Sequence, residues 1–207
     1  MRRGWGAPLA AALLLGGAAL MLYGVWIPAK AALAQQLIDR AWQETRRTGE
    51  PSPPWPWADT VPIARLRAPR LQISTLVLSG ATGASLAFGP GHLSGTPAPG
   101  AAGNSAIAGH RDTHFRFLAE LKPGDTLELE TADRGFHRYE VYRLEVVHER
   151  ETRVLTDAGL RELTLLTCYP FHALRSGGPL RYVVRALARD EPDPTPPLIA
   201  HLQNGFH

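Results

Sequence analysis

The sequence contains a single cysteine, Cys168, which follows the apolar run Leu163–Thr167 and precedes Tyr169-Pro170. It therefore lies at the C-terminal edge of a predicted strand, where a scaffold can present a reactive group to a loop-lined cleft. A lone cysteine in an apolar strand is more often a small core residue. One cysteine excludes an intrachain disulfide and a zinc site built from cysteines. The residue type alone leaves nucleophile and core residue both open.

Two further residues at strand ends, His110 and Arg181, carry side chains that can exchange protons or bind anions. His110 follows Gly109, which allows a close backbone approach and aims the imidazole outward. Arg181 opens the last predicted strand and shares one of its faces with Arg185. Each of these residues alone is typical of a solvated surface. His114 is four residues from His110, but no further ligand completes a metal set, so we predict neither a metal nor a cofactor.

The elements that must position these residues are short strands. Apolar and β-branched segments alternate with Gly/Pro-rich connections and little helix between residues 62 and 189. Seven or eight such strands predict a mainly β fold, a closed or nearly closed β-barrel with short helices. The expected strands are Ala64–Leu71, Gln72–Leu78, Asn104–Ala108 (extending to His110), Thr126–Glu130, Arg138–Val147, Glu162–Thr167 and Arg181–Leu187, with helical turns at Phe115–Leu121.

The N-terminus predicts a transmembrane helix ahead of the barrel. The 21 residues Ala7–Ile27 are uncharged and apolar, and as a helix they span about 31 Å, the thickness of the hydrocarbon core of a bilayer. Arg2 and Arg3 hold the short tail in the cytoplasm by the positive-inside rule. A cleaved signal peptide is the alternative, with a small-residue site at Ala32-Leu33-Ala34, but its apolar region is usually about 7–15 residues.

Proline-rich segments mark the domain boundaries. Ala31–Thr45 reads as a helical stalk with Leu33, Leu37 and Trp42 at near-helical spacing, and Gly49–Trp57 ends it with four prolines in nine residues. The expected organisation is a cytoplasmic tail at 1–6, a transmembrane signal-anchor at 7–27, a helical stalk and Pro-rich linker at 28–58, the barrel domain at 59–190, and a disordered tail at 191–207.

The charge distribution argues against nucleic acid as a partner. Lys and Arg number 22 and Asp and Glu 19, which gives a net charge of +3. No run of Arg exceeds two residues, whereas a nucleic-acid footprint needs basic residues clustered on one face.

Six short motifs occur in a fixed order along the chain: Gly89-Pro90-Gly91-His92, Pro99-Gly100, Gly103-Asn104, Ile107–Arg111, Thr164–Cys168 and Arg181–Val184. Together they resemble the sortases, which are membrane-anchored cysteine transpeptidases with an eight-stranded barrel. The resemblance covers roughly Pro62 to Arg189. The first motif and the stretch Gly109–Asp112 are closest to sortases other than class A, including the Gram-negative type, whose sorting signal need not be Leu-Pro-x-Thr-Gly.

The resemblance implies a role for each residue. Cys168 is expected to be the nucleophile, His110 the acid/base, Arg181 the group that stabilises the oxyanion or holds the substrate, and Thr167 a residue that positions the acyl group. The implied reaction cleaves the C-terminal sorting motif of a secreted protein through a thioester and transfers it to an amine, on the periplasmic or extracytoplasmic side of the membrane. No acidic cluster matches the calcium site of some class A sortases, so no metal is expected.

Asp112, two residues past His110, has two readings. It is either a solvated turn residue or helix N-cap, or a residue that orients His110 and raises its pKa.

Three other functions remain to be weighed. A papain-like protease places its cysteine on a helix ahead of its histidine, and an L,D-transpeptidase has a Ser-His-Gly-Cys element; neither matches Cys168. The alternative that stays open is a non-catalytic, membrane-anchored β-barrel that binds a partner and buries Cys168.

Overall fold

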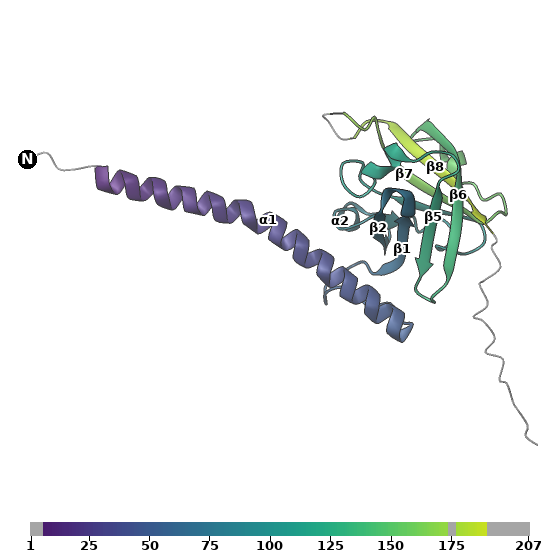
Figure 1. Ribbon diagram of the computed structural model, residues 1–207, viewed down its shortest axis with the longest axis horizontal. Helices are drawn as coiled ribbons and strands as arrows, with labels where there is room; N and C mark the ends of the chain where they lie inside the picture. Colours follow the sequence, from purple (N-terminus) through teal and green to yellow (C-terminus); the bar gives the residue numbers. More distant parts are fainter. Residues whose placement is uncertain (1–5, 174–176, 190–207) are drawn as a thin grey trace, which may run out of the picture.

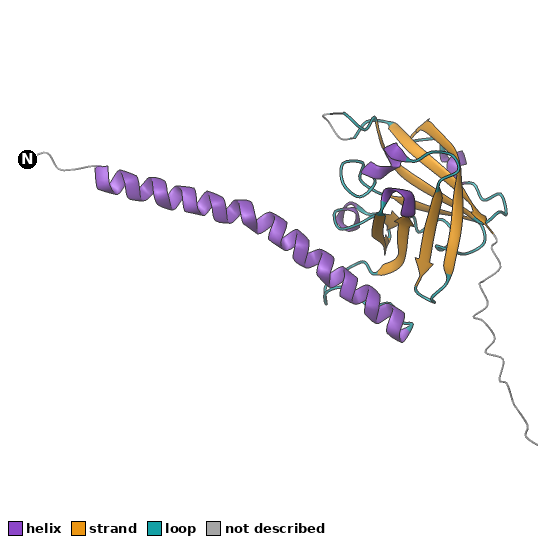
Figure 2. Ribbon diagram, viewed as in Figure 1, coloured by secondary structure: helices purple, strands orange, loops and turns teal. Residues whose placement is uncertain are grey.

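The described part of the chain forms a long helix and a β-barrel (Figures 1 and 2). The computed structural model describes residues 6–173 and 177–189. Helix α1 (Gly6–Thr48) has 43 residues and continues through Pro28, so at 1.5 Å per residue it is about 64 Å long. The predicted tails at 1–6 and 191–207 lie outside the described residues, apart from Gly6.

Eight strands close the barrel in the order β1-β2-β3-β4-β7-β8-β6-β5. Strand pairs β2–β3 and β4–β7 are parallel, and the other pairs are antiparallel. The strands are β1 (Pro62–Ala68), β2 (Ile73–Ser79), β3 (Gly91–His92), β4 (Asn104–Ala108), β5 (Thr126–Thr131), β6 (Phe136–His148), β7 (Glu162–Tyr169) and β8 (Leu180–Arg189), joined by α2 (Gly83–Leu86) and the 3-10 turns η1 (Pro69–Leu71), η2 (Arg116–Glu120) and η3 (Thr152–Leu155).

The core follows the strand period of two. Along β1, alternate residues are buried, with Ala64, Leu66 and Ala68 at most 1% exposed. Leu127 and Leu129 of β5 contribute the same alternation from the neighbouring strand. Each fully buried leucine contributes about 1.5–3 kcal/mol, so this interior stabilises the barrel without a disulfide. The same cluster also includes Phe115, Phe117, Leu118, Leu121, Ile107, Leu163 and Leu165.

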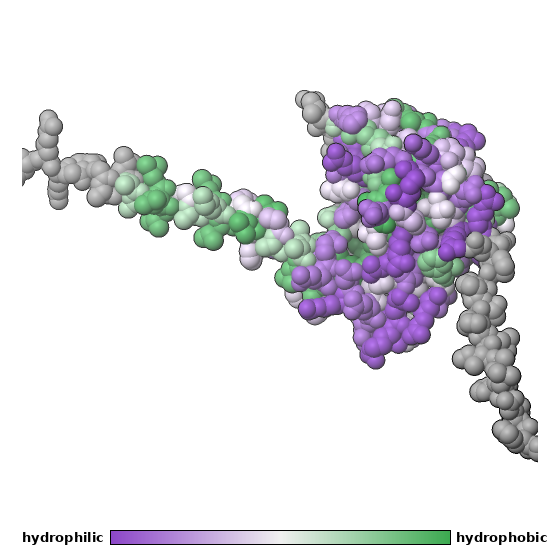
Figure 3. Space-filling view, in the orientation of Figure 1, coloured by the Kyte–Doolittle hydropathy of each residue, from purple (hydrophilic) through white to green (hydrophobic). Residues whose placement is uncertain are grey.

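Helix α1 has two halves that differ in their surroundings. Its N-terminal half carries exposed apolar side chains from Leu13 to Ile27, seen as the green stretch in Figure 3. By length and composition, this helix could cross a membrane, although a signal sequence would pass the same test. The C-terminal half lies against the barrel, where Ile38 and Trp42 are 2% exposed and Asp39 pairs with Arg65 at 3.1 Å.

The strands predicted from the sequence occur with shifted ends. β3 was not predicted, because its two residues are too short to show alternation; they pair with Leu78 and Ser79 of β2 and with Ile107 and Ala108 of β4. The strand expected to reach His110 ends at Ala108, since the His110 carbonyl already accepts the Phe115 N–H of a turn. Of the stalk residues, Trp42 is buried, whereas Leu33 is 54% exposed.

Candidate active site

Strand pairing brings the ends of β4, β7 and β8 together. β4 and β7 run parallel with Ala108 opposite Leu166, so His110 and Cys168 each lie two residues beyond that pair. β7 and β8 are antiparallel, and Cys168 lies directly opposite Arg181. Directly opposed residues point to the same face of a sheet. The barrel thus places Cys168 of β7 between the segment after β4, which carries His110, and β8, which carries Arg181.

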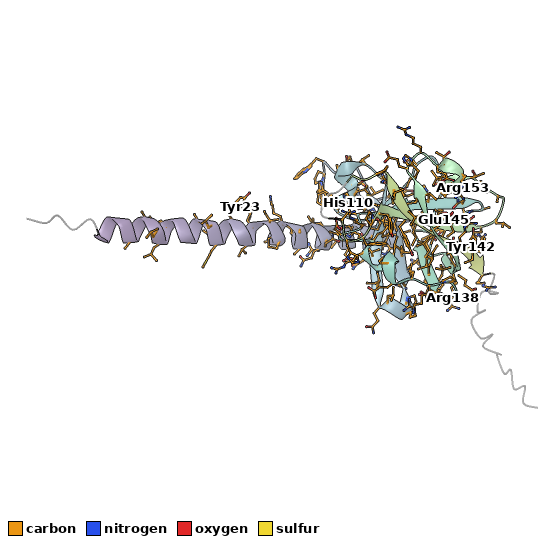
Figure 4. All side chains as sticks on the ribbon, turned by 90° about the horizontal axis from the view of Figure 1, so that it is seen from above. Tyr23, His110, Arg138, Tyr142, Glu145 and Arg153 are labelled. Carbon is orange, nitrogen blue, oxygen red and sulfur yellow. The ribbon has the colours of Figure 1, made fainter. Side chains whose placement is uncertain are left out.

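All three residues line one cavity of about 340 Å³, at the small end of the usual size of a ligand pocket. Cys168 is half-buried rather than buried in the core, and His110 is exposed. Figure 4 shows His110 on the side of the barrel nearer to the apolar half of α1, with Tyr142, Glu145 and Arg153 farther along. The rest of the lining is largely apolar: Leu86, Leu93, Ala108, Val147, Val154, Leu155 and Leu166.

The Arg181 guanidinium is held from two sides. Nη1 donates to the carbonyls of Gly178 at 2.6 Å and Leu180 at 2.9 Å. Nη2 donates to Oε2 of Glu149 at 2.6 Å. A guanidinium has five N–H donors, so Nε–H and one Nη2–H remain without a protein acceptor in the described structure.

Close contacts fix the approach of the chain to His110. The Gly109 N–H donates to the Leu166 carbonyl at 3.1 Å. A Cβ at Gly109 would come within 2.8 Å of the Phe115 ring, so this position requires glycine. The Thr167 hydroxyl, which is buried, donates to the Gly109 carbonyl at 2.7 Å. Thr167 thus ties β7 to the residue before His110, and its expected contact with the acyl group stays a prediction.

Arg111, which the sequence does not single out, lies outside the cavity lining and joins two segments next to the cavity. Its side chain is 3% exposed, and its Nη1 and Nη2 donate to the carbonyls of Pro170 at 2.7 Å and Ala173 at 2.8 Å. It therefore fastens the segment after Cys168 to the segment after His110. Its Nε lies 3.2 Å from Oδ1 of Asp112, which is 64% exposed. Asp112 contacts Arg111 in a turn, and its predicted effect on His110 is not tested by this contact.

Asn104 positions the loop that forms another wall of the cavity. Its Nδ2 donates to the Val154 carbonyl at 2.9 Å, and its Oδ1 accepts from the Thr164 hydroxyl at 2.7 Å. Both Asn104 and Thr164 are fully buried. Val154, in η3, packs with Val147 and Val183 and lines the cavity. In the sequence, Asn104 stands out only as part of a motif. Its partners Val154 and Thr164 become visible only in the folded structure.

Burial shifts the pKa of two groups outside the cavity lining, His114 and Tyr182. It lowers the pKa of His114, against an opposing hydrogen bond to the Ala87 backbone, with the nearby His110 a lesser cause in the same direction. Burial also raises the pKa of Tyr182, and Tyr169 adds to that rise. Among the described residues, no three His, Cys, Asp or Glu side chains are grouped so that they could hold a metal ion.

Comparison with known proteins identifies relatives of the barrel. Residues 66–189 match the sortase domain family. Sortase D of Bacillus subtilis is 32% identical over 120 residues, covering 58% of this chain and 60% of that protein. Sortase SrtE1 of Streptomyces coelicolor is 38% identical over 80 residues, covering 33% of this chain and 23% of that protein. The matched regions thus span less than two thirds of both curated relatives.

A solved structure agrees with the sequence matches. Sortase A from Corynebacterium diphtheriae superposes with a TM-score of 0.60 at 29% identity, covering 68% of this chain and 66% of that one. The curated relatives are consistent with the predicted type other than class A, while the Gram-negative type stays a prediction. Since the family match covers more than half of the chain and the predicted eight-stranded barrel is present, this chain belongs to the sortase family, whose members are cysteine transpeptidases.

Proposed function

We propose that this chain is a membrane-anchored cysteine transpeptidase. It cleaves a secreted protein at a C-terminal sorting motif and transfers the acyl group of that protein to an amine. The observation that carries the proposal is the convergence of Cys168, His110 and Arg181 on one cavity at the shared end of β4, β7 and β8. A half-buried thiol that lines a cavity favours this function over a binding module with a buried cysteine.

In the proposed reaction, the Cys168 thiolate attacks the carbonyl carbon of a substrate peptide bond, which forms a C–S bond and moves an electron pair onto the oxygen. When that pair returns, the C–N bond breaks and the departing amine takes a proton from His110. An incoming amine then attacks the thioester carbon and gives a proton to His110. The C–S bond breaks, which forms the new amide and restores the thiolate.

Arg181 is proposed to stabilise the negative charge of the tetrahedral intermediate. A guanidinium is a planar cation with a fork of donors, and two of the Arg181 N–H donors have no acceptor among the described residues. Donors that are already in place where charge develops lower the barrier of acyl transfer. A nearby cation also favours the thiolate form of a cysteine.

The apolar half of α1 supports the proposed anchoring, with the barrel on the periplasmic or extracytoplasmic side. His110 lies on the side of the barrel nearer to that half (Figure 4), so a substrate held at the membrane by its own apolar segment would reach the cavity. The substrate's motif and the accepting amine belong to this proposal, and no metal or cofactor takes part in the steps above.

The test is transfer to a simple amine. Purified protein is incubated with peptides based on Leu-Pro-x-Thr-Gly, varied at each position, and with hydroxylamine, which captures a thioester as a hydroxamate. We expect mass spectrometry to detect the hydroxamate with the native protein and not with Cys168→Ala. Hydroxamate formation by Cys168→Ala, or no product and no thioester from any peptide of the panel, would contradict the proposal.

A further inference from the structure

Glu149 occupies a fixed position beside the cavity. It follows His148, the last residue of β6, and its backbone N–H donates to the Pro179 carbonyl at 2.7 Å. This bond ties Glu149 to the chain just before β8. Its carboxylate Oε2 then accepts from Arg181 Nη2 at 2.6 Å, and both residues line the cavity that contains Cys168.

Glu149 supplies what the two backbone carbonyls cannot. Gly178 and Leu180 both accept from Nη1, so neither carbonyl holds the other terminal nitrogen, Nη2. The carboxylate binds the other terminal nitrogen and fixes the plane. A charge-assisted bond is stronger than a bond to a neutral carbonyl, so Glu149 restrains the plane that carries the two remaining donors, Nε–H and one Nη2–H.

We propose that Glu149 is a positioning residue that holds the Arg181 guanidinium beside Cys168, so that its two remaining N–H donors meet the reacting carbonyl. This inference rests on the proposed function and adds to it a residue that acts only through Arg181. Sequence reasoning could not find Glu149, because it is one of many charged residues and only the pairing of β6 with β8 brings it to Arg181.

The charge and the contact of Glu149 have separable effects. The charged or titratable groups that line the cavity with Cys168 are His110 after β4, His148 of β6, Glu149 and Glu151 of the loop after β6, and Arg181 of β8. Loss of the Glu149 charge leaves the Arg181 cation uncompensated, which favours the thiolate. Loss of the contact lets the guanidinium move, which disfavours the oxyanion. Thiol reactivity and turnover should therefore change in opposite directions.

The experiment compares Glu149→Gln, which keeps an acceptor oxygen but no charge, with Glu149→Ala, which keeps neither. We expect kcat with the best peptide of the panel to fall about tenfold in Glu149→Ala and only about threefold in Glu149→Gln, with KM little changed. The midpoint pH of Cys168 alkylation by iodoacetamide should fall by a similar amount in both. Equal kcat in the two variants, or a kcat of Glu149→Ala equal to that of the native protein, would overturn the proposal.

Glu140 provides the matched control. It is a β6 residue paired with Arg189 of β8 through a 2.8 Å hydrogen bond, outside the cavity lining, and its side chain is 38% exposed, against 45% for Glu149. Glu140→Ala should keep kcat within about twofold of the native value and leave the alkylation midpoint in place. A tenfold loss there would mean that any β6–β8 ion pair matters to activity, which would overturn the specific role of Glu149.

A double variant separates this inference from the proposed function. If Glu149 acts through Arg181, then Glu149→Ala should cost little further activity in an Arg181→Ala background. A further tenfold loss there would show that Glu149 acts by another route and would overturn the inference. Activity that survives in Cys168→Ala would instead overturn the proposed function, whatever the Glu149 variants show.

Discussion

The β7–β8 pair carries an arginine–glutamate ion pair toward each end, and the two ion pairs differ in how exposed they are. At the cavity end, Arg181 lies opposite Cys168 and pairs with Glu149. At the other end, Arg185 lies opposite Thr164 and pairs with Glu162, the first residue of β7. Both arginines are on one face of one strand, four residues apart. Only Arg181 lines the cavity with Cys168.

The Arg185 pair is closed, whereas the Arg181 pair is open. Arg185 Nε and Nη2 donate to the two carboxylate oxygens of Glu162 at 2.5 and 2.9 Å, and the Tyr142 hydroxyl donates to the same carboxylate at 2.8 Å. The Glu162 side chain is 2% exposed. Burial, with a smaller contribution from Glu162, raises the pKa of Tyr142 to about 12. Arg181, by contrast, keeps two donors beside a cavity. Removal of one partner of a buried ion pair leaves an uncompensated charge and destabilises the fold, while donors without a protein acceptor at a cavity are available to a ligand.

The largest expected effect is at Cys168. Cys168→Ala should abolish formation of both the thioester and the hydroxamate, because no other thiol is present in the chain. Removal of one sulfur from a half-buried site should cost about 1–2 kcal/mol, which a domain of ordinary stability survives. Circular dichroism and a thermal melt check the fold. Residual turnover by a folded Cys168→Ala variant would mean that Cys168, opposite Arg181, is not the nucleophile.

The second effect is at Arg181. Arg181→Ala should lower kcat/KM at least a hundredfold, or about 2.7 kcal/mol of transition-state stabilisation. Arg181→Lys should recover little, because an ammonium cannot reproduce the planar fork of donors. Steady-state transfer to hydroxylamine measures both variants. A greater loss of activity at Arg185 than at Arg181 would reverse the assignment.

Strands β4, β7 and β8 show which features of the site the sequence predicts. The sequence places Cys168 and Arg181 correctly at strand ends, each as a special residue at one end of an apolar run, whereas His110 lies two residues past the end of β4. The combination of the three residues is recognisable as a family pattern. The family pattern also implies the barrel. Its strands can be predicted because the alternation of buried and exposed residues is a local property of the sequence.

The hydrogen-bond partners around the site could not be predicted from the sequence, because they depend on the register between distant strands. Arg111 reaches Pro170 across 59 residues, and Glu149 reaches Arg181 across 32. Asn104 reaches Val154 across 50. β3 escaped prediction for a related reason: two residues show no period, and only their neighbours in the sheet make them a strand.

The third prediction concerns the closed pair. Arg185→Ala should keep kcat/KM within a few-fold of the native value but destabilise the fold by about 2–3 kcal/mol, because it leaves the buried Glu162 carboxylate without its cation. The melting temperature should fall by about 5–10 °C. Should this variant not fold, Arg185→Lys keeps the charge and loses the fork, and the same separation of stability from activity is expected. An unchanged melting temperature would contradict a structural role.

The smallest effect is at a third pair, which has the fork geometry of Arg185 without its burial. Arg70 donates to both Asp125 oxygens at 2.6 and 2.7 Å. The Arg70 side chain is 47% exposed, against 16% for Arg185, and the Asp125 side chain is 10% exposed, against 2% for Glu162. The Arg70 hydrogen bonds, with a smaller contribution from the Lys122 N–H, hold the pKa of Asp125 below its usual value. Because the pKa is lower in the folded state, this carboxylate stabilises the fold above about pH 4, its usual value when unfolded.

That stabilisation is lost as the pH falls through the lowered pKa of Asp125. Asp125→Asn should therefore lower the melting temperature by about 1–3 °C at pH 7, with native and variant converging toward pH 2. Melts at a series of pH values measure the gap. If the melting temperature at pH 7 falls as far as in Arg185→Ala, then fork geometry, rather than burial, determines how much such ion pairs contribute to stability. A gap that persists at pH 2 would mean that the turn needs the shape of the side chain and not its charge.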